Sequence, residues 1–125
     1  MRDVLLSLDI GLIKKVLSGE VSVIVRKTVP RKIFNKVVVC SKGRSPKVYG
    51  HFYIKEVPCL LVDDLWEYTK GKLSMDKDEF YKFLKGETVC YAFVIDEVVG
   101  LEDPCNLSEM LPEMPLFSFD FIYLN

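Results

Sequence analysis

The chain has 125 residues, of which 50% are hydrophobic and 28% are charged, and its formal net charge is −1. This length and apolar content predict one globular domain, residues 1–125, with enough apolar side chains for a single core. No apolar run approaches the roughly 20 residues that a membrane-spanning helix needs, and the nearly balanced charge by itself predicts no polyanion partner.

A strand and a helix are predicted at the start of the chain. Residues 3–10 have the apolar density of a short buried strand. Residues 11–19 carry apolar side chains at helical spacing, with Lys14 and Lys15 on the other side, and Gly19 is a typical C-terminal stop. These features predict an amphipathic helix that follows directly on the strand.

A second strand is predicted over residues 21–27, which are rich in β-branched residues. Side chains alternate along a strand, so Val21, Val23 and Val25 are expected to share one buried face. The opposite face then reaches a cavity or solvent.

The middle of the chain predicts two strands joined by a basic loop. Residues 36–41 read as the first of them, residues 42–47 as the loop, and residues 48–57 as a long strand. Gly50 lies inside the long strand, where a glycine marks a bulge or a close approach of another backbone segment.

The second half of the chain mixes helices and strands. Residues 62–71 predict a short helix, and a second helix is expected to begin near a capping Ser74. Residues 88–98 predict a strand, residues 100–115 a turn-rich connection, and residues 116–124 a closing strand. This order lacks the strict alternation of a parallel α/β sheet. It predicts an α+β fold, a small mixed, partly closed β-barrel with flanking helices.

The cysteines predict neither a zinc site nor a disulfide framework. Cys40, Cys59, Cys90 and Cys105 form no CxxC pair, and His51 is the single histidine. Three of these cysteines lie in apolar, strand-like segments, where a free thiol acts as a small buried hydrophobe. We therefore expect reduced thiols and, with no secretory signal pattern at the N-terminus, a cytoplasmic protein.

Charge is distributed unevenly along the chain. Residues 1–55 hold 12 Lys or Arg and 3 Asp or Glu, whereas residues 56–125 hold 5 and 15. One interpretation is a basic face and an acidic face. The alternative is that the two halves intermix in space and neutralise each other.

Several segments occur in an informative order: "VLLSL", an amphipathic helix, "SGE", a strand that ends at Arg26, "VVVCS", "VYGHFYIKEV", and a late aromatic strand. In this order they resemble the ASCH domain, a member of the PUA-like superfamily, over most of the chain. The resemblance implies a PUA-like barrel, a cleft between the first helix and the barrel strands, and RNA or modified nucleotides as ligands.

The most diagnostic family pattern, GxKxxExR, aligns with Gly19, Val21, Ile24 and Arg26, and matches at the first and the last. The resemblance implies that family members which hydrolyse N4-acetylcytidine use Lys where this chain has Val21 and Thr where it has Ile24. Aliphatic side chains have neither a lone pair nor a transferable proton for this reaction. The resemblance thus disfavours that activity. We expect either a pocket that binds without hydrolysis or a pocket that Val21 and Ile24 fill.

Arg26 and the cations that follow it form the candidate nucleic-acid surface. Eight of the 17 basic residues lie within residues 26–47. Such a patch neutralises phosphates, and arginine adds bidentate recognition of a phosphate or a base edge. The alternative is a solvated strand edge, which lysines protect from aggregation. The predicted binding residues are Ser22, Arg26, Lys27, Arg31, Lys32, Lys42, Arg44, Lys47 and Tyr49, the last as a stacking platform.

Three functions from different classes follow from these features. The first is a protein that binds RNA, single-stranded nucleic acid or a modified nucleoside, with no metal and no cofactor. The second is a nucleoside or nucleic-acid hydrolase with a rearranged active site. The third is a protein-interaction module that uses the acidic C-terminal half to dock on a basic partner or on the basic half of another copy.

Overall fold

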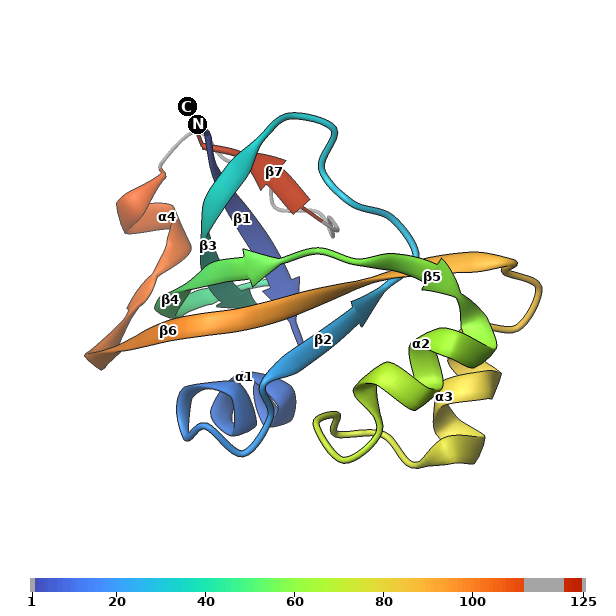
Figure 1. The fold of residues 1–125 in the computed structure, drawn as a ribbon. Coiled ribbons are helices and arrows are strands. Elements are labelled where there is room, and N and C mark those ends of the chain that lie inside the picture. Colours follow the sequence, from blue (N-terminus) through green and yellow to red (C-terminus); the bar gives the residue numbers. More distant parts are fainter. Residues whose placement is uncertain (1, 112–120, 125) are drawn as a thin grey trace.

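The structure is a computed structural model that describes residues 2–111 and 121–124. Strands and helices alternate irregularly along these residues (Figure 1). In chain order they are β1 (Arg2–Leu8), α1 (Ile10–Leu17), β2 (Val23–Arg26), β3 (Phe34–Ser41), β4 (Lys47–Glu56), β5 (Cys59–Leu61), α2 (Val62–Thr69), α3 (Lys77–Phe83), β6 (Val89–Asn106), α4 (Leu107–Met110) and β7 (Phe121–Tyr123).

The strands form one mixed sheet that curls into a half-barrel. Its order is β2-β6-β4-β3-β1-β7, and β5 pairs with β6. β1 and β3 run parallel, with Leu8 opposite Ser41, whereas the other pairs are antiparallel. In Figure 1, α1 lies below the sheet and α2 and α3 pack beside each other at the end of β5. The predicted α+β fold, a partly closed barrel with flanking helices, is confirmed.

The predicted burial of the three valines near β2 is confirmed, but their common face is not. Val23 and Val25 pack against α2 and α3, whereas Val21 belongs with Ile24 to the cluster around α1 and Phe52. Val21 precedes the strand, and its backbone N–H donates to the Lys15 carbonyl 3.1 Å away. Strand alternation therefore does not extend to Val21, and both faces of β2 are buried rather than one.

Gly50 is the point of close backbone contact predicted within the long strand. It has a φ of +154° and pairs with Gly100 across β4 and β6, beside a register shift. A Cβ atom at this position would lie 2.3 Å from the Val99 carbonyl oxygen. The glycine thus permits β6 to follow β4 through the curl of the barrel.

Two sequence predictions in the second half need correction. The helix expected to start near Ser74 is capped by Asp76, whose carboxylate accepts from the Glu79 N–H at 2.9 Å in a capping box. Residues 100–106, predicted as connection, continue β6, because its antiparallel partner β4 holds them as far as Asn106. Of the predicted closing strand, residues 121–123 form β7 and residues 116–120 lie outside the described part.

The four cysteines are free in the structure. Cys40 and Cys90 are buried and Cys59 is exposed. Burial raises the pKa of the Cys40 thiol to about 11 and also raises the pKa of Cys90. These two thiols are therefore protonated at neutral pH, and a protonated thiol is a poor nucleophile.

Thiol alkylation of the native protein at pH 7 should therefore modify Cys59 first and Cys40 last, with the Cys40 rate rising as the pH approaches the pKa. Peptide mass spectrometry after timed quenching measures the order. Under denaturing, non-reducing conditions all four thiols should react. Only two reactive thiols, or none, in the denatured chain would show that disulfides form and that this account of the cysteines is wrong.

Among the described residues, no helix has the length and apolar character needed to cross a membrane.

Candidate functional site

The surface is hollowed where α1, β2, β3 and α3 meet. A small cavity of about 210 Å³, here called the inner cavity, lies against β2 and is lined by Arg26, Lys42 and Phe83 among others. A wider depression of about 840 Å³, here called the outer cleft, lies between α1 and α3. The two share Asp9, Leu12, Ser74, Met75 and Phe83, so they form one continuous cleft.

The parallel pairing of β1 and β3 places two charged residues at one edge of the sheet. Leu8 lies opposite Ser41 at the end of both strands, so the next residues, Asp9 and Lys42, emerge side by side. Both line the inner cavity. Asp9 is also the N-cap of α1, but its carboxylate makes no capping hydrogen bond. That carboxylate therefore lies at the start of α1 without a hydrogen bond to the helix backbone.

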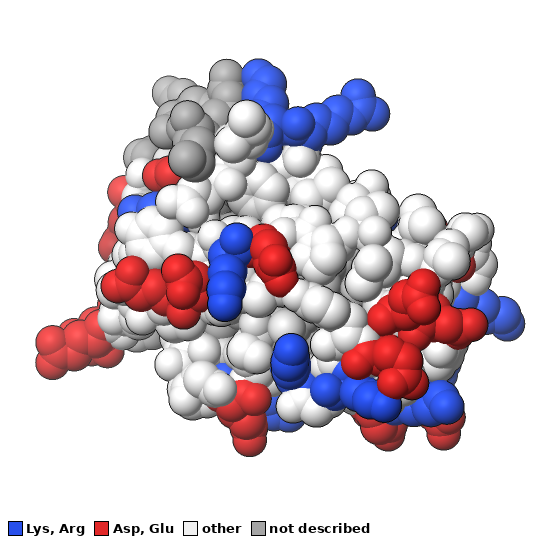
Figure 2. All heavy atoms as spheres, viewed as in Figure 1, with Lys and Arg blue, Asp and Glu red and all other residues white. Residues whose placement is uncertain are grey.

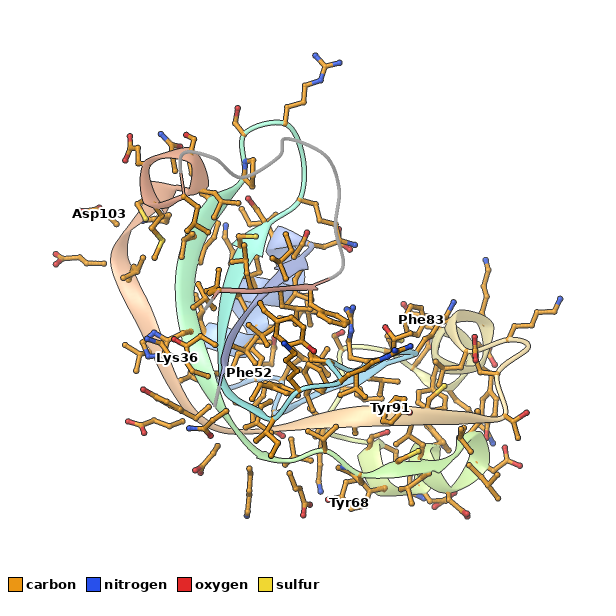
Figure 3. The ribbon with its side chains drawn as sticks, turned by 90° about the horizontal axis from the view of Figure 1, so that it is seen from above. Lys36, Phe52, Tyr68, Phe83, Tyr91 and Asp103 are labelled. Atoms are coloured by element: carbon orange, nitrogen blue, oxygen red, sulfur yellow. The ribbon has the colours of Figure 1, made fainter. Side chains whose placement is uncertain are left out.

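The opposite wall comes from α3 and the connection that precedes it. The Lys72 carbonyl accepts from the Ser22 N–H at 3.2 Å, which ties this connection to the residues before β2. The Asp76 capping box then fixes the start of α3. Phe83, at the end of α3, is 39% exposed, and the Lys27 Nζ lies 5.0 Å from its ring centroid. Figure 3 shows Phe83 on α3, remote from Phe52 in the core of the half-barrel.

The cleft is cationic although the chain is nearly neutral. Five cations and two carboxylates line it: Arg26, Lys42, Lys15, Lys27 and Lys82, with Asp9 and Glu79. A concave site with an excess of one charge attracts ligands of the opposite charge. The walls between these charges are apolar and include Leu12, Met75 and Phe83. The arrangement suits an anion with a flat apolar part.

Three of the nine predicted binding residues, Arg26, Lys27 and Lys42, line the cleft. Figure 3 shows Lys36, another cation of the basic segment, far from Phe83, so residues 26–47 do not form one surface. On the face drawn in Figure 2, blue and red side chains are interspersed, which favours intermixed charge there over one basic face.

The structure places the other six predicted residues elsewhere. The Lys32 N–H donates to the Tyr123 hydroxyl at 2.9 Å, so this cation lies beside β7. Lys47 pairs with Asn106 near the far end of β6, and Tyr49 packs against the core cluster around Phe52. The remaining three, Ser22, Arg31 and Arg44, have exposed side chains and do not line the cleft.

The sequence did not identify Asp9, Lys15, Ser74 or Phe83 as cleft residues. Phe83 lies in an apolar helical pattern, which favours core packing over its alternative role as a ring that stacks on a base. The available signal was the position of Asp9 and Lys42 directly after two strands, because the ends of parallel strands meet at one edge. The sequence alone does not show that these two strands pair.

Val21 and Ile24, the two residues that depart from the GxKxxExR pattern, differ in their surroundings. Ile24 is 4% exposed and lines the inner cavity. Val21 is 2% exposed, belongs to the core cluster around α1, and does not line the cleft. The expected alternative in which both residues fill the pocket is therefore not observed, since the cavity is present beside Ile24.

No group of three or more His, Cys, Asp or Glu within the described ranges is placed to hold a metal ion.

Comparisons with known proteins identify the fold. No family model matches the sequence, and no curated protein matches it. Among solved structures, the ASCH protein from Zymomonas mobilis superimposes with a TM-score of 0.87 at 17% identity, covering 98% of this chain and 87% of that chain. A Tyr-to-Phe variant of the same protein gives a TM-score of 0.87 at 18% identity, with 100% and 91% covered. A Ser-to-Ala variant gives 0.87 at 17% identity, with 98% and 88% covered.

At 17–18% sequence identity, these superpositions show that the chain shares the fold of the matched structures. The chain therefore has an ASCH-like fold, and the resemblance predicted from its sequence is confirmed at this level.

Proposed function

We propose that this chain binds RNA or a modified nucleotide in the cleft between α1 and α3. The supporting observation is that Arg26 and Lys42, far apart in the sequence, line one cavity whose other walls are apolar. The ASCH-like fold supports the same proposal, because the resemblance implies RNA or nucleotide ligands for this family.

Each part of the cleft holds a different part of the ligand. Pockets for small molecules are typically about 300–1,000 Å³, and the inner cavity, at about 210 Å³, lies below that range. It therefore holds one ring system. The outer cleft, with Lys15, Lys27 and Lys82, holds the sugar and the phosphates. Phe83 borders both parts and offers a ring face to a base.

We also propose that the chain does not hydrolyse N4-acetylcytidine. The aligned positions are aliphatic, and Val21 is buried away from the cleft. No side chain at these two positions can start the attack on an acyl group. Incubation with acetylcytidine should leave the nucleoside intact by chromatography. Release of cytidine above a protein-free control would show that catalytic groups lie elsewhere in the cleft.

The binding proposal is tested by comparing the substitution of Lys42 with that of Arg44, two cations of the same loop. Lys42 lines the inner cavity, whereas Arg44 is exposed outside it. Because a hydrogen bond to a charged group contributes about 1.5–3 kcal/mol, Lys42→Ala should weaken binding of a labelled short RNA by about tenfold or more. Arg44→Ala, the matched control, should change the affinity by less than about twofold. Fluorescence anisotropy measures both.

Equal losses in the two variants would indicate a diffuse basic surface, and no loss in either would place the site elsewhere. The salt dependence gives a second readout. Each neutralised phosphate contributes about −0.7 to the slope of log K against log salt for single strands. Lys15→Ala, which removes a cation from the outer cleft that holds the phosphates, should therefore make the slope shallower by about that amount, and Arg44→Ala should not.

A further inference from the structure

We infer that Asp9 selects the base, and that the preferred base is guanine. This inference rests on the proposed function, since it assigns a ligand class to the same cleft. It starts from one observation that phosphate binding does not explain: a carboxylate lies among the cations, lining both the inner cavity and the outer cleft.

Asp9 is well placed to contact a ligand. It directly follows β1, beside Lys42 at the paired ends of two strands, so a rigid part of the sheet holds its backbone. Its side chain is exposed and makes no capping hydrogen bond to α1. Asp9 thus makes no capping hydrogen bond, and it lines the same cavity as Lys42 and Ser74.

The charge of Asp9 opposes phosphate binding. A carboxylate near Arg26 and Lys42 lowers the local positive potential and so weakens the attraction for any polyanion. Glu79, the other carboxylate of the cleft, has a structural reason to be there, because its side chain accepts from the Asp76 N–H in the capping box. We infer that Asp9 lies in the cationic cleft because its carboxylate accepts hydrogen bonds from donors on the ligand.

An ionised carboxylate accepts hydrogen bonds and donates none. Guanine carries its ring N1–H and its 2-amino group side by side, so it presents two parallel donors to two carboxylate oxygens. Cytosine and adenine present an amino group next to a ring nitrogen lone pair. Uracil presents one N–H between two carbonyl oxygens. In these three bases an acceptor lies beside the donor and repels the carboxylate, so guanine is the best match.

Inosine isolates this contact, because it lacks only the 2-amino group of guanosine. A good bidentate contact to a base contributes about 1–3 kcal/mol of discrimination. Inosine keeps one of the two hydrogen bonds, so we expect a value near the lower end of that range, about 1.4 kcal/mol or tenfold in affinity. The test ligands are three labelled RNA pentamers with uridine at the four outer positions. Their central nucleoside is guanosine, inosine or uridine. Their phosphates are identical, so affinity ratios report on the central base alone.

The wild-type chain should bind the guanine pentamer about tenfold more tightly than the inosine pentamer. In Asp9→Asn this ratio should fall to less than about threefold. Asparagine is as good an N-cap as aspartate, so the helix start is retained. Loss of a negative charge from the cleft should strengthen binding of all three pentamers together, and only the ratio separates base recognition from this general effect. Glu20→Gln, at the exposed end beyond α1 and outside the cleft, is the matched control and should keep the wild-type ratio.

The outcomes separate the two proposals. If no pentamer binds, or if binding is insensitive to Lys42→Ala, the proposed binding of RNA in this cleft is wrong. If binding depends on Lys42 but the guanine and inosine pentamers bind equally, the cleft binds RNA and the inference about Asp9 is wrong. A guanine preference that persists unchanged in Asp9→Asn also overturns it, because another group then reads the base.

Discussion

Replacing Gly50 with alanine should lower the free energy of unfolding by about 3 kcal/mol or more. Two effects add at this position. A Cβ atom would lie 2.3 Å from the Val99 carbonyl oxygen and 2.9 Å from the Gly100 Cα, and both are backbone atoms that no rotamer change moves aside. The backbone also has a φ of +154°, which L-residues rarely adopt. Chemical denaturation followed by circular dichroism measures the loss.

Gly100→Ala is the matched control, because Gly100 lies opposite Gly50 on β6. A Cβ atom there would meet only the Leu17 side chain, at 3.8 Å, which is ordinary contact. The free energy of unfolding should therefore change by less than about 1 kcal/mol. If both variants were equally stable, β4 and β6 would not approach each other as closely as the structure shows.

Phe80→Ala should cost about 3–5 kcal/mol of stability. Phe80 is fully buried on α3, in one apolar cluster with Val23 and Val25 of β2 and Leu65 of α2. Its ring centroid lies 5.1 Å from that of Trp66, so the substitution removes an aromatic contact as well as apolar volume. Thermal and urea denaturation should show the loss, accompanied by an apparent loss of ligand binding as the chain unfolds.

Phe83→Ala is the functional counterpart on the same helix. Phe83 is 39% exposed and lines the cleft, so its removal should cost less than about 1 kcal/mol of stability. Stacking on an aromatic ring contributes about 1–3 kcal/mol per base, so RNA affinity should still fall severalfold at temperatures where the variant is folded. Unchanged affinity in folded Phe83→Ala would remove this ring from the proposed site.

The strands of the first half were predictable because their signals are local. Alternation and β-branched residues indicate β2 and β3, and Gly50 indicates a close backbone approach whichever strand supplies the neighbour. The extent of β6 was not predictable in this way. Gly100 and Pro104 are typical of turns, yet pairing with the long strand β4 keeps both within a strand. Tertiary pairing here overrides the local preference.

The cleft was predicted only in part, for a geometric reason. A basic segment in the sequence becomes a basic surface only if its strands stay side by side and its loops point one way. The curl of the half-barrel instead brings Lys42 to the cleft and Lys32 to β7. Asp9 and Phe83 come from elements far from that segment, so their proximity depends on the parallel pairing of β1 with β3 and on the position of α3.

The central claim, that RNA lies in the cleft between α1 and α3, is tested most directly by photo-crosslinking. A short RNA that contains 4-thiouridine is irradiated with the native protein, and the crosslinked peptides are identified by mass spectrometry. The account predicts crosslinks within residues 73–83 and 9–15, which form the two walls of the outer cleft, and their reduction in Lys42→Ala. Crosslinks concentrated at residues 31–36 or 44–53, with the cleft peptides unmodified, would contradict it.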